Sequence, residues 1–313
     1  MSKRFVLVVS HTGREDSLLA GQEVCAALIA AGITPVMTPT ELADYQKFAQ
    51  SHVAPHPVIN QVASLGTDAQ LAELEVVMVL GGDGTILKAA EVVRESATPL
   101  LGINLGHVGF LAESERDGLT DAVERVVNKD YLVKERLALD VRVIVGGKEE
   151  FRTWALNEAT IEKSASERML EVVVEIDQRP LSSFGCDGIV MSTPTGSTAY
   201  SFSAGGPVVW PSVEALLLVP LSAHALFARP LVINPNSLLA VEVMQRSAGH
   251  GVLWCDGRRT WALPPGARVE VRKSDLPVRL ARFRQGPFTD RLVRKFSLPV
   301  DGWRGPEAGS SKA

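Results

Sequence analysis

Short apolar runs and helical repeats alternate along the first part of the chain. Apolar residues run without interruption at 5–9 and 76–80, which is typical of parallel strands buried on both faces, and a further strand is expected at 100–104. Residues 16–31 and 85–94 instead repeat apolar positions at the spacing of an amphipathic helix. Strands that alternate with helices predict an α/β unit with a mostly parallel sheet.

The second part of the chain has a strand period. Apolar and polar residues alternate over 137–145, and Gly146-Gly147 then indicates a hairpin turn. Residues 170–184 repeat this form around Asp177-Gln178. Further strands are expected at 238–244, 251–254 and 268–272. The fold class is therefore an α/β N-terminal domain with a mostly parallel sheet, followed by a mainly β C-terminal domain.

The length of 313 residues also favours two domains over one. We place the α/β domain at residues 1–133 and the mainly β domain at 134–288. Residues 289–303 are expected to pack back on the first domain, with a helix from about Thr289 to Phe296. Residues 304–313 have the composition of a disordered tail.

Composition and charge narrow the classes of function. The residues are 46% apolar and 22% charged, which is enough for substantial cores. The three cysteines, Cys25, Cys186 and Cys255, are isolated in the sequence, as expected for a cytoplasmic chain in a reducing compartment. A net charge of −4 gives no broad attraction for nucleic acid or an anionic membrane, and no apolar stretch reaches membrane length. An anionic ligand must therefore be held by local groups.

The strongest local signal is the sequence Gly81-Gly82-Asp83-Gly84-Thr85, which follows an apolar strand and opens a helix. Glycines let the backbone approach a ligand, and helix N-termini favour anions. A carboxylate at such a place is costly unless it accepts a proton or binds a cation that accompanies phosphate. The alternative is that Asp83 only caps the helix. Lys88, one turn further on, either reaches back toward a phosphate or lies on a solvated face.

Two further stretches offer polar groups without net charge. Residues 187–207 lead from an apolar run into a loop dense in glycine and hydroxyls, which could read the edges of a base or ribose. A Ser/Thr-rich turn followed by a short helix is the alternative. Asn157-Glu158 follows the strand segment Trp154-Ala155-Leu156, and an amide can pair with the edge of adenine.

Taken together, these motifs resemble those of the NAD kinase family, in which the Gly-Gly-Asp-Gly-Thr loop, Asn-Glu and the hydroxyl-rich loop occur in this order. The resemblance extends to residues 101–111, 224–230 and 255–257, and so covers most of the chain. It implies a two-domain kinase that phosphorylates the 2′-hydroxyl of the adenosine ribose of NAD. ATP, and in some bacterial relatives polyphosphate, is the donor, with Mg²⁺ accompanying it.

The resemblance also assigns residues. Asp83 is the proton acceptor, and the phosphate loop consists of Gly81, Gly82, Gly84 and Thr85. The residues expected to contact NAD are Asp83, Gly84, Lys88, Asn157, Glu158, Arg168, Asp187, Thr198, Ala199, Tyr200, Ser201, Phe202 and Ser203. No protein metal site is expected, since prolines disrupt the helical pairing of His52 with His56. A homodimer or homotetramer is implied by the family alone.

Two other functions remain open at this point. Diacylglycerol- and sphingosine-type lipid kinases also carry a Gly-Gly-Asp-Gly loop in a two-domain chain. A non-catalytic dinucleotide sensor would bind NAD without turnover. The intact Asp83 disfavours the sensor, and the Asn-Glu and hydroxyl-rich stretches favour NAD over lipid.

Overall fold

The computed structural model describes residues 3–51, 57–106, 109–164, 169–247, 249–283 and 287–300. The chain divides into two compact units, one formed by residues 1–134 with 279–313 and the other by residues 135–278. The second boundary therefore follows Val278, and not residue 288 as the sequence suggested. The reason is a strand, β20 (Val278–Arg282), which pairs in parallel with a strand of the first unit.

The first unit is built on a sheet of eight strands within the described residues, with the order β3-β2-β1-β4-β5-β20-β7 and with β6 beside β5. Its other strands are β1 (Phe5–Ser10), β2 (Thr34–Met37), β3 (Ala63–Ser64), β4 (Leu74–Leu80), β5 (Leu100–Asn104), β6 (Ser114–Glu115) and β7 (Leu132–Arg136). The pairings of β1 with β2 and β4, and of β4 with β5, are parallel, as the apolar runs predicted.

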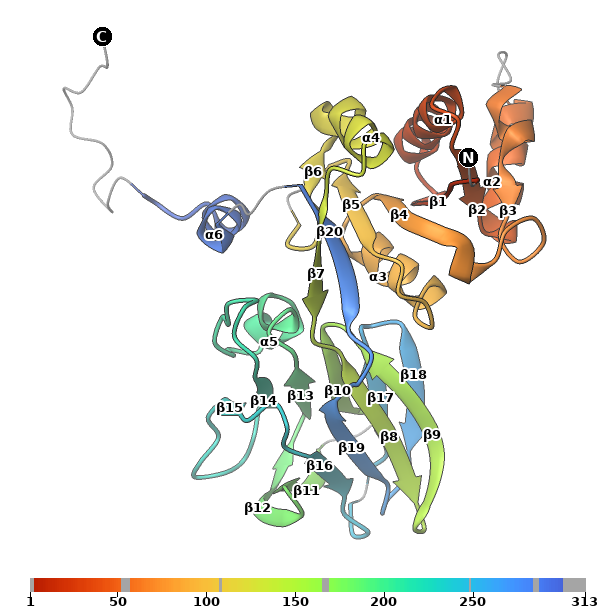
Figure 1. Ribbon diagram of the computed structural model, residues 1–313. Helices are drawn as coiled ribbons and strands as arrows, with labels where there is room; N and C mark the ends of the chain where they lie inside the picture. Colours follow the sequence, from red (N-terminus) through yellow and green to blue (C-terminus); the bar gives the residue numbers. More distant parts are fainter. Residues whose placement is uncertain are drawn as a thin grey trace, which may run out of the picture. The chain divides into compact units, whose positions relative to one another are not determined.

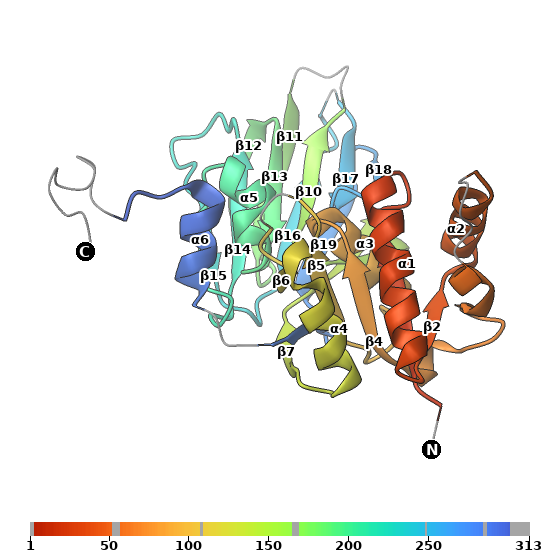
Figure 2. The same ribbon diagram turned by 90° about the horizontal axis from the view of Figure 1, so that it is seen from above.

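Helices cover both faces of this sheet (Figures 1 and 2). They are α1 (Glu15–Ala30), α2 (Pro39–Ser51), α3 (Asp83–Val92) and α4 (Leu119–Val127). A further helix of this unit, α6 (Phe288–Phe296), follows β20. Val6 and Val8 of β1 share one apolar core with α1 and α4, whereas the intervening Leu7 points to the opposite face and is also fully buried. Burial on both faces explains why the central strands β1, β4 and β5 are apolar along most of their length.

The second unit is a sandwich of two antiparallel sheets. One sheet contains β15 (Leu231–Ile233), β14 (Leu216–Leu221), β13 (Gly188–Ser192), β10 (Glu158–Lys163), β17 (Gly251–Cys255) and β18 (Arg259–Leu263), in that order. The other contains β12 (Arg179–Cys186), β11 (Leu170–Ile176), β16 (Leu239–Val243), β19 (Arg268–Lys273), β8 (Leu139–Val145) and β9 (Lys148–Ala155). The short helix α5 (Tyr200–Ser203) follows β13.

The predicted hairpins of this unit are confirmed. Asp177 and Gln178 both have positive φ, 51° and 64°, between the paired strands β11 and β12. Gly146 and Gly147 likewise have φ of 57° and 79° between β8 and β9. Two consecutive residues with positive φ give the turn that best matches strand twist. The inward side chains of both sheets form one apolar core, which includes Val141, Ile161 and Leu253.

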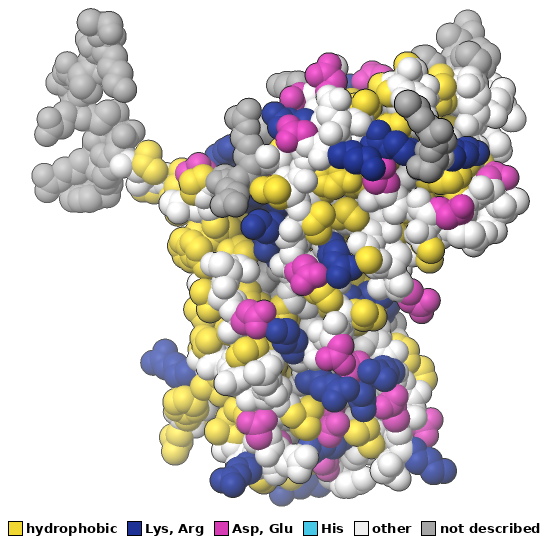
Figure 3. Space-filling view, in the orientation of Figure 1, with side chains coloured by type: hydrophobic (Ala, Val, Ile, Leu, Met, Phe, Trp, Pro, Cys, Tyr) yellow, Lys and Arg dark blue, Asp and Glu magenta, His cyan; other side chains and the backbone are white. Residues whose placement is uncertain are grey.

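The surface carries no concentration of one charge on the face shown in Figure 3, where basic and acidic side chains are interspersed with apolar ones. Within the described ranges, no helix has both the length and the apolar character needed to cross a membrane.

Candidate active site

The glycine loop turns the chain sharply from strand β4 into helix α3. Gly81 has a φ of 154°, and a Cβ there would lie 2.9 Å from the Cβ of Thr85. Its N–H donates to the carbonyl of Ile103 in β5 at 2.9 Å, which fixes the loop to the carboxyl edge of the sheet. Only glycine fits this position, because both the positive φ and the close side chain exclude a larger residue.

Gly82 and Gly84 have a different reason to be glycine. Neither has a left-handed φ, and apart from the neighbouring backbone no atom of the described residues lies within 4 Å of the place where a Cβ would be. Both residues are exposed at the start of α3. The N–H of Thr85 donates to the carbonyl of Gly82 at 2.9 Å, whereas the N–H groups of Asp83 and Gly84 come too early to find an acceptor within the helix. Packing of the fold therefore does not require glycine at these two positions. The absence of side chains there does, however, leave room for a phosphate to approach the helix N-terminus.

The carboxylate of Asp83 is held by backbone groups from a distant segment. Asp83 is the first residue of α3, and its Oδ2 and Oδ1 accept the N–H groups of Phe110 and Leu111, each at 3.1 Å. A Cβ on Gly109 would collide with the same carboxylate. The Asp83 carboxylate thus bonds to the segment after β5, whereas a helix cap would bond to the first turn of α3. Sequence reasoning selected Asp83 but did not foresee these partners.

Lys88 is engaged in an ion pair within the first unit. Its Nζ lies 2.9 Å from Oε1 of Glu41 in α2, and the Glu41 side chain is only 2% exposed. Glu41 also accepts from the hydroxyl of Thr38 and from the N–H of Ser10. The Lys88 side chain keeps 37% exposure, so it also faces solvent. The structure therefore gives Lys88 a partner that the sequence did not indicate.

In the second unit, Asn157 and Glu158 lie where the chain leaves β9 and enters β10. The buried carboxylate of Asp256 accepts three successive N–H groups at this step, from Leu156 at 2.9 Å, Asn157 at 2.7 Å and Glu158 at 3.3 Å. Arg259 donates to the same carboxylate at 2.8 Å. Asp256 was not selected from the sequence as a site residue, although Asp-Gly after an apolar run marks a turn. It shapes the backbone that presents Asn157.

Glu158 is a buried acid with an incomplete set of partners. Its Oε2 has no hydrogen-bond partner among the described groups, and the residue is 7% exposed. Burial, and secondarily the charge of Asp256, raises the pKa of Glu158 to about 8, while the backbone N–H of Tyr200 opposes the shift. At neutral pH the carboxyl therefore mostly carries a proton and can donate a hydrogen bond as well as accept one.

The hydroxyl-rich loop is bound tightly to the backbone of Leu156 and Asn157. Thr193 donates from Oγ1 to the carbonyl of Leu156 at 2.6 Å, and its N–H donates to the carbonyl of Asn157 at 2.9 Å. Gly196 packs so closely on that carbonyl that a Cβ would overlap it. The hydroxyls of Ser197 and Thr198 donate to carbonyls within the loop. These hydroxyls build the loop, as the alternative of a structured turn anticipated.

The residues after this loop present a different surface. A short turn (Gly196–Thr198) leads through Ala199 into α5. Tyr200, Phe202 and Ser203 are exposed, whereas Ser201 is buried and its Oγ has no hydrogen-bond partner among the described groups. Burial and the neighbouring carboxylate of Glu162 raise the pKa of Tyr200. Exposed aromatic rings beside an unsatisfied hydroxyl suit a nucleoside ligand better than a sealed turn.

Asp187 lies at the other end of strand β13 from Glu158. In the pairing of β10 with β13, Glu158 is opposite Ser192 and Glu162 is opposite Gly188. Asp187 forms an ion pair with Lys163 at 2.8 Å, and this pairing, together with the hydroxyl of Ser222, lowers its pKa. The structure therefore does not bring Asp187 together with the Asn157-Glu158 step. Arg168, the remaining predicted contact, lies outside the described residues.

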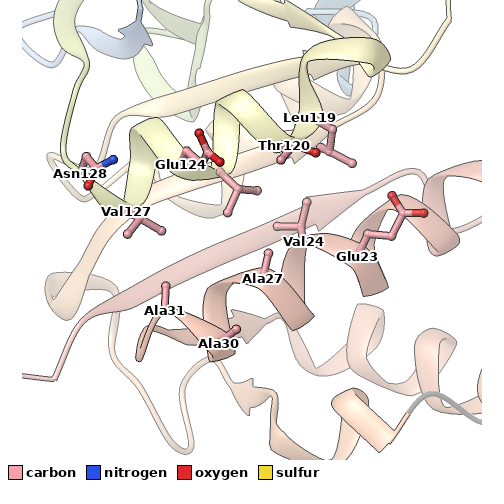
Figure 4. A pocket seen from close by; sticks show the side chains of 11 residues that line it. Glu23, Val24, Ala27, Ala30, Ala31, Leu119, Thr120, Glu124, Val127 and Asn128 are labelled. Atoms are coloured by element: carbon pink, nitrogen blue, oxygen red, sulfur yellow. The ribbon is translucent and has the colours of Figure 1, made fainter.

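An apolar cavity elsewhere in the first unit does not suit the same ligand. It has a volume of about 440 Å³ and lies between α1 and α4, with Val24, Ala27 and Val127 among its lining side chains (Figure 4). The charged side chains that line it, Glu23 and Glu124, are acidic. Such a lining would repel phosphate groups, so the glycine loop remains the candidate for anion binding.

Comparison with known proteins places these features in a family. The model of the ATP-NAD kinase N-terminal domain matches residues 6–131, and that of the C-terminal domain matches residues 156–283. An NAD kinase of Leifsonia xyli is 64% identical over 98% of either chain. Two solved structures have the same fold at 21% identity. One is yeast NADH kinase complexed with NADH (TM-score 0.83, covering 96% of this chain and 89% of that one). The other is an Archaeoglobus fulgidus NAD kinase in complex with ATP (TM-score 0.67, covering 94% and 99%).

Proposed function

The chain belongs to the NAD kinase family, and from that premise we propose that it transfers the terminal phosphoryl group of ATP to the 2′-hydroxyl of the adenosine ribose of NAD, giving NADP. The observation that carries the proposed mechanism is the Asp83 carboxylate at the start of α3, oriented by the N–H groups of Phe110 and Leu111. A lipid substrate is disfavoured, because the chain matches the NAD kinase family models for both the N-terminal and the C-terminal domain.

Asp83 acts as the proton acceptor in this mechanism. The oxygen of the 2′-hydroxyl forms a bond to the terminal phosphorus of ATP as the bond from that phosphorus to its bridging oxygen breaks. The proton of the hydroxyl passes to Asp83, and ADP leaves with the electron pair of the broken bond. Each carboxylate oxygen has more than one lone pair, so an oxygen that accepts an N–H can still accept the hydroxyl. The N–H groups of Phe110 and Leu111 hold the Asp83 carboxylate in one orientation, which helps to align it with the 2′-hydroxyl.

The glycine loop is proposed to orient the donor phosphates. Exposed Gly82 and Gly84 leave the first N–H groups of α3 open to anionic oxygens, and Gly81 and Thr85 fix the turn. Among the described residues, no group of three or more His, Cys, Asp or Glu side chains could hold a metal. On the basis of the family resemblance, Mg²⁺ is proposed to enter with the phosphates of the donor, whose oxygens it prefers as ligands, and to neutralise their charge.

The second unit is proposed to hold the dinucleotide. Asn157, at the step shaped by Asp256, supplies an amide that can pair with a base or ribose. Glu158 can donate or accept toward a hydroxyl, while Tyr200 and Phe202 offer exposed rings for a nucleoside. Asp187, Thr198, Ala199, Ser201 and Ser203 remain proposed contacts by family resemblance. Lys88 and Arg168 do so as well.

Three properties of the whole protein are proposed on the same family basis. The three cysteines are buried and free, which suits the reducing cytoplasm as its location. A homodimer or homotetramer is the proposed assembly. Inorganic polyphosphate is proposed as a second donor beside ATP.

A direct assay tests the function. Purified full-length chain is incubated with NAD and Mg²⁺, with ATP and polyphosphate as donors in parallel, and NADP is detected through an NADP-specific dehydrogenase. NADP formed only when a donor is present supports the proposal. Binding of NAD without NADP formation would identify a sensor, and labelled phosphate found on diacylglycerol or sphingosine but not on NAD would identify a lipid kinase.

A further inference from the structure

The segment that orients Asp83 is itself anchored by helix α6, at the far end of the described chain. Arg291 of α6 donates from Nη1 to the carbonyls of Phe110 at 2.9 Å and Ala112 at 3.0 Å. Its Nη2 donates to Oε2 of Glu113 at 3.0 Å. A planar guanidinium presents its donors in a fixed fork and here holds three points of the segment at once, whereas the donors of a lysine ammonium have no fixed planar arrangement.

One peptide group connects Arg291 to Asp83. The carbonyl of Phe110, which accepts from Arg291, and the N–H of Leu111, which donates to Oδ1 of Asp83, belong to the same peptide unit. This unit is planar, so its carbonyl and N–H cannot turn independently. If the carbonyl loses its anchor and the plane rotates, the N–H leaves the Asp83 carboxylate. Arg291 therefore acts on Asp83 through a single rigid group.

Other contacts make this anchor firm. Glu113, whose side chain is 7% exposed, also accepts from Arg282 at 2.9 Å and from the N–H of Phe283 at 3.0 Å. The ring of Phe110 lies between two rings of α6, with centroid distances of 6.0 Å to Phe288 and 5.8 Å to Phe296. Charge-assisted bonds and aromatic packing thus fix both the backbone and the side chain of the segment.

We propose that Arg291 is a positioning residue for phosphoryl transfer, because it fixes the Phe110–Leu111 peptide that orients the Asp83 carboxylate. This proposal rests on the proposed role of Asp83 as proton acceptor. Arg291 touches neither substrate nor the reacting atoms in this scheme. Its loss therefore affects the rate of transfer, and leaves the binding of NAD by the second unit unchanged.

The test compares Arg291→Ala with Arg294→Ala, which removes the same charge from an exposed position of the same helix. For Arg291→Ala we expect kcat to fall about 10- to 100-fold, as displaced catalytic groups do, with KM for NAD within about twofold. Arg294→Ala should change neither. Arg291→Lys keeps the charge but lacks the planar fork, so its kcat should lie between those of wild type and Arg291→Ala. It replaces the alanine variant in the test if that variant does not fold.

A second measurement does not depend on activity. Hydrogen exchange of the Phe110 and Leu111 amides should be faster in Arg291→Ala than in wild type and Arg294→Ala, because their anchor is gone. Unchanged exchange, or a folded Arg291→Ala with wild-type kcat, overturns the proposal. The proposal is also overturned if kcat is unchanged and the whole loss in kcat/KM comes from a higher KM for NAD. If wild type forms no NADP, the proposed function fails, whereas the exchange result still decides whether Arg291 anchors the segment.

Discussion

The carboxylate of Asp256 accepts the backbone N–H of Asn157 at 2.7 Å, although 99 residues of chain separate them. The same carboxylate accepts the neighbouring N–H groups of Leu156 and Glu158, so three peptide groups converge on one buried side chain. The backbone step that presents the amide of Asn157 is thus defined by a residue from another strand connection. The position of the Asn157 amide therefore depends on the carboxylate of Asp256.

Replacing Asp256 with asparagine should weaken NAD binding. The amide keeps one acceptor oxygen but points N–H groups at another donor, so one charge-assisted contact becomes repulsive. We expect a loss of about 1–3 kcal/mol in the free energy of unfolding and a rise of roughly tenfold in KM for NAD. Asp177→Asn is the matched control, since Asp177 also accepts a backbone N–H, from Leu238 at 2.9 Å, but in an exposed hairpin turn. Equal KM values for the two variants would contradict the role of Asp256.

Asp83→Asn should retain NAD binding and lose most phosphorylation. Asparagine has nearly the same shape as aspartate, but it cannot accept the proton of the 2′-hydroxyl. Its amide nitrogen would also face one of the two backbone N–H groups that the carboxylate accepts, which lowers kcat further and does not touch the second unit. We expect kcat to fall by at least about 100-fold, the lower range for loss of general base catalysis, with the dissociation constant for NAD changed by less than about threefold. Single-turnover rates and calorimetric binding measure the two quantities separately. Turnover close to that of wild type would exclude Asp83 as the base.

Gly109→Ala should displace the Asp83 carboxylate without unfolding the chain. The new methyl group would collide with the carboxylate, and that side chain can turn away more readily than the backbone can move. We expect kcat to fall about 10- to 100-fold. Gly106→Ala is the control, because no atom lies within 4 Å of the corresponding Cβ position in the same segment. A comparable loss of kcat in both variants would show that the segment tolerates no added methyl group, and that the collision with Asp83 is not the cause.

The buried acid Glu158 should make stability depend on pH. Its pKa is raised from 4.5 to about 8 by burial, so between these values the folded chain keeps a proton that the unfolded chain has lost. Wild type should therefore lose stability as the pH rises from about 4.5 to about 8, whereas Glu158→Gln lacks this contribution. The free energy of unfolding of the variant relative to wild type should increase over this window by on the order of a few kcal/mol. Denaturant titrations at several pH values check it, and parallel pH curves would refute it.

The periodic elements were predictable because each has a local cause. The runs that became β1, β4 and β5 are apolar at nearly every position, and the strands of the sandwich alternate because only one face is buried. The helix α4 and the strands β14 and β20 were not expected. The run that forms β14 is apolar throughout, which fits a buried strand or a helix equally. The place of β20 in the first sheet depends on its partner β5, which local sequence does not specify.

The sequence suggests candidate site residues, but it does not indicate the contacts that hold them in place. Glycines around Asp83 and the Asn157-Glu158 pair are visible as short motifs. The partners that give them geometry are backbone N–H groups, which every residue carries and which no pattern distinguishes. Lys88 illustrates the same limit, since its spacing suggested a phosphate contact whereas its ion pair with Glu41 depends on the packing of α2. Arg291 has no sequence signal beyond its charge.

The return of β20 and α6 to the first unit determines when that unit can be completed during translation. The strands from β1 to β5 emerge from the ribosome early, but their sheet gains β20 only after the whole sandwich has been synthesised. Arg291 emerges later still, so the segment that orients Asp83 is anchored at the end of synthesis. A nascent or prematurely ended chain that already has a folded sandwich thus has no anchored base. If Arg291 has the proposed role, such a molecule transfers phosphate about 10- to 100-fold more slowly than one in which α6 is in place.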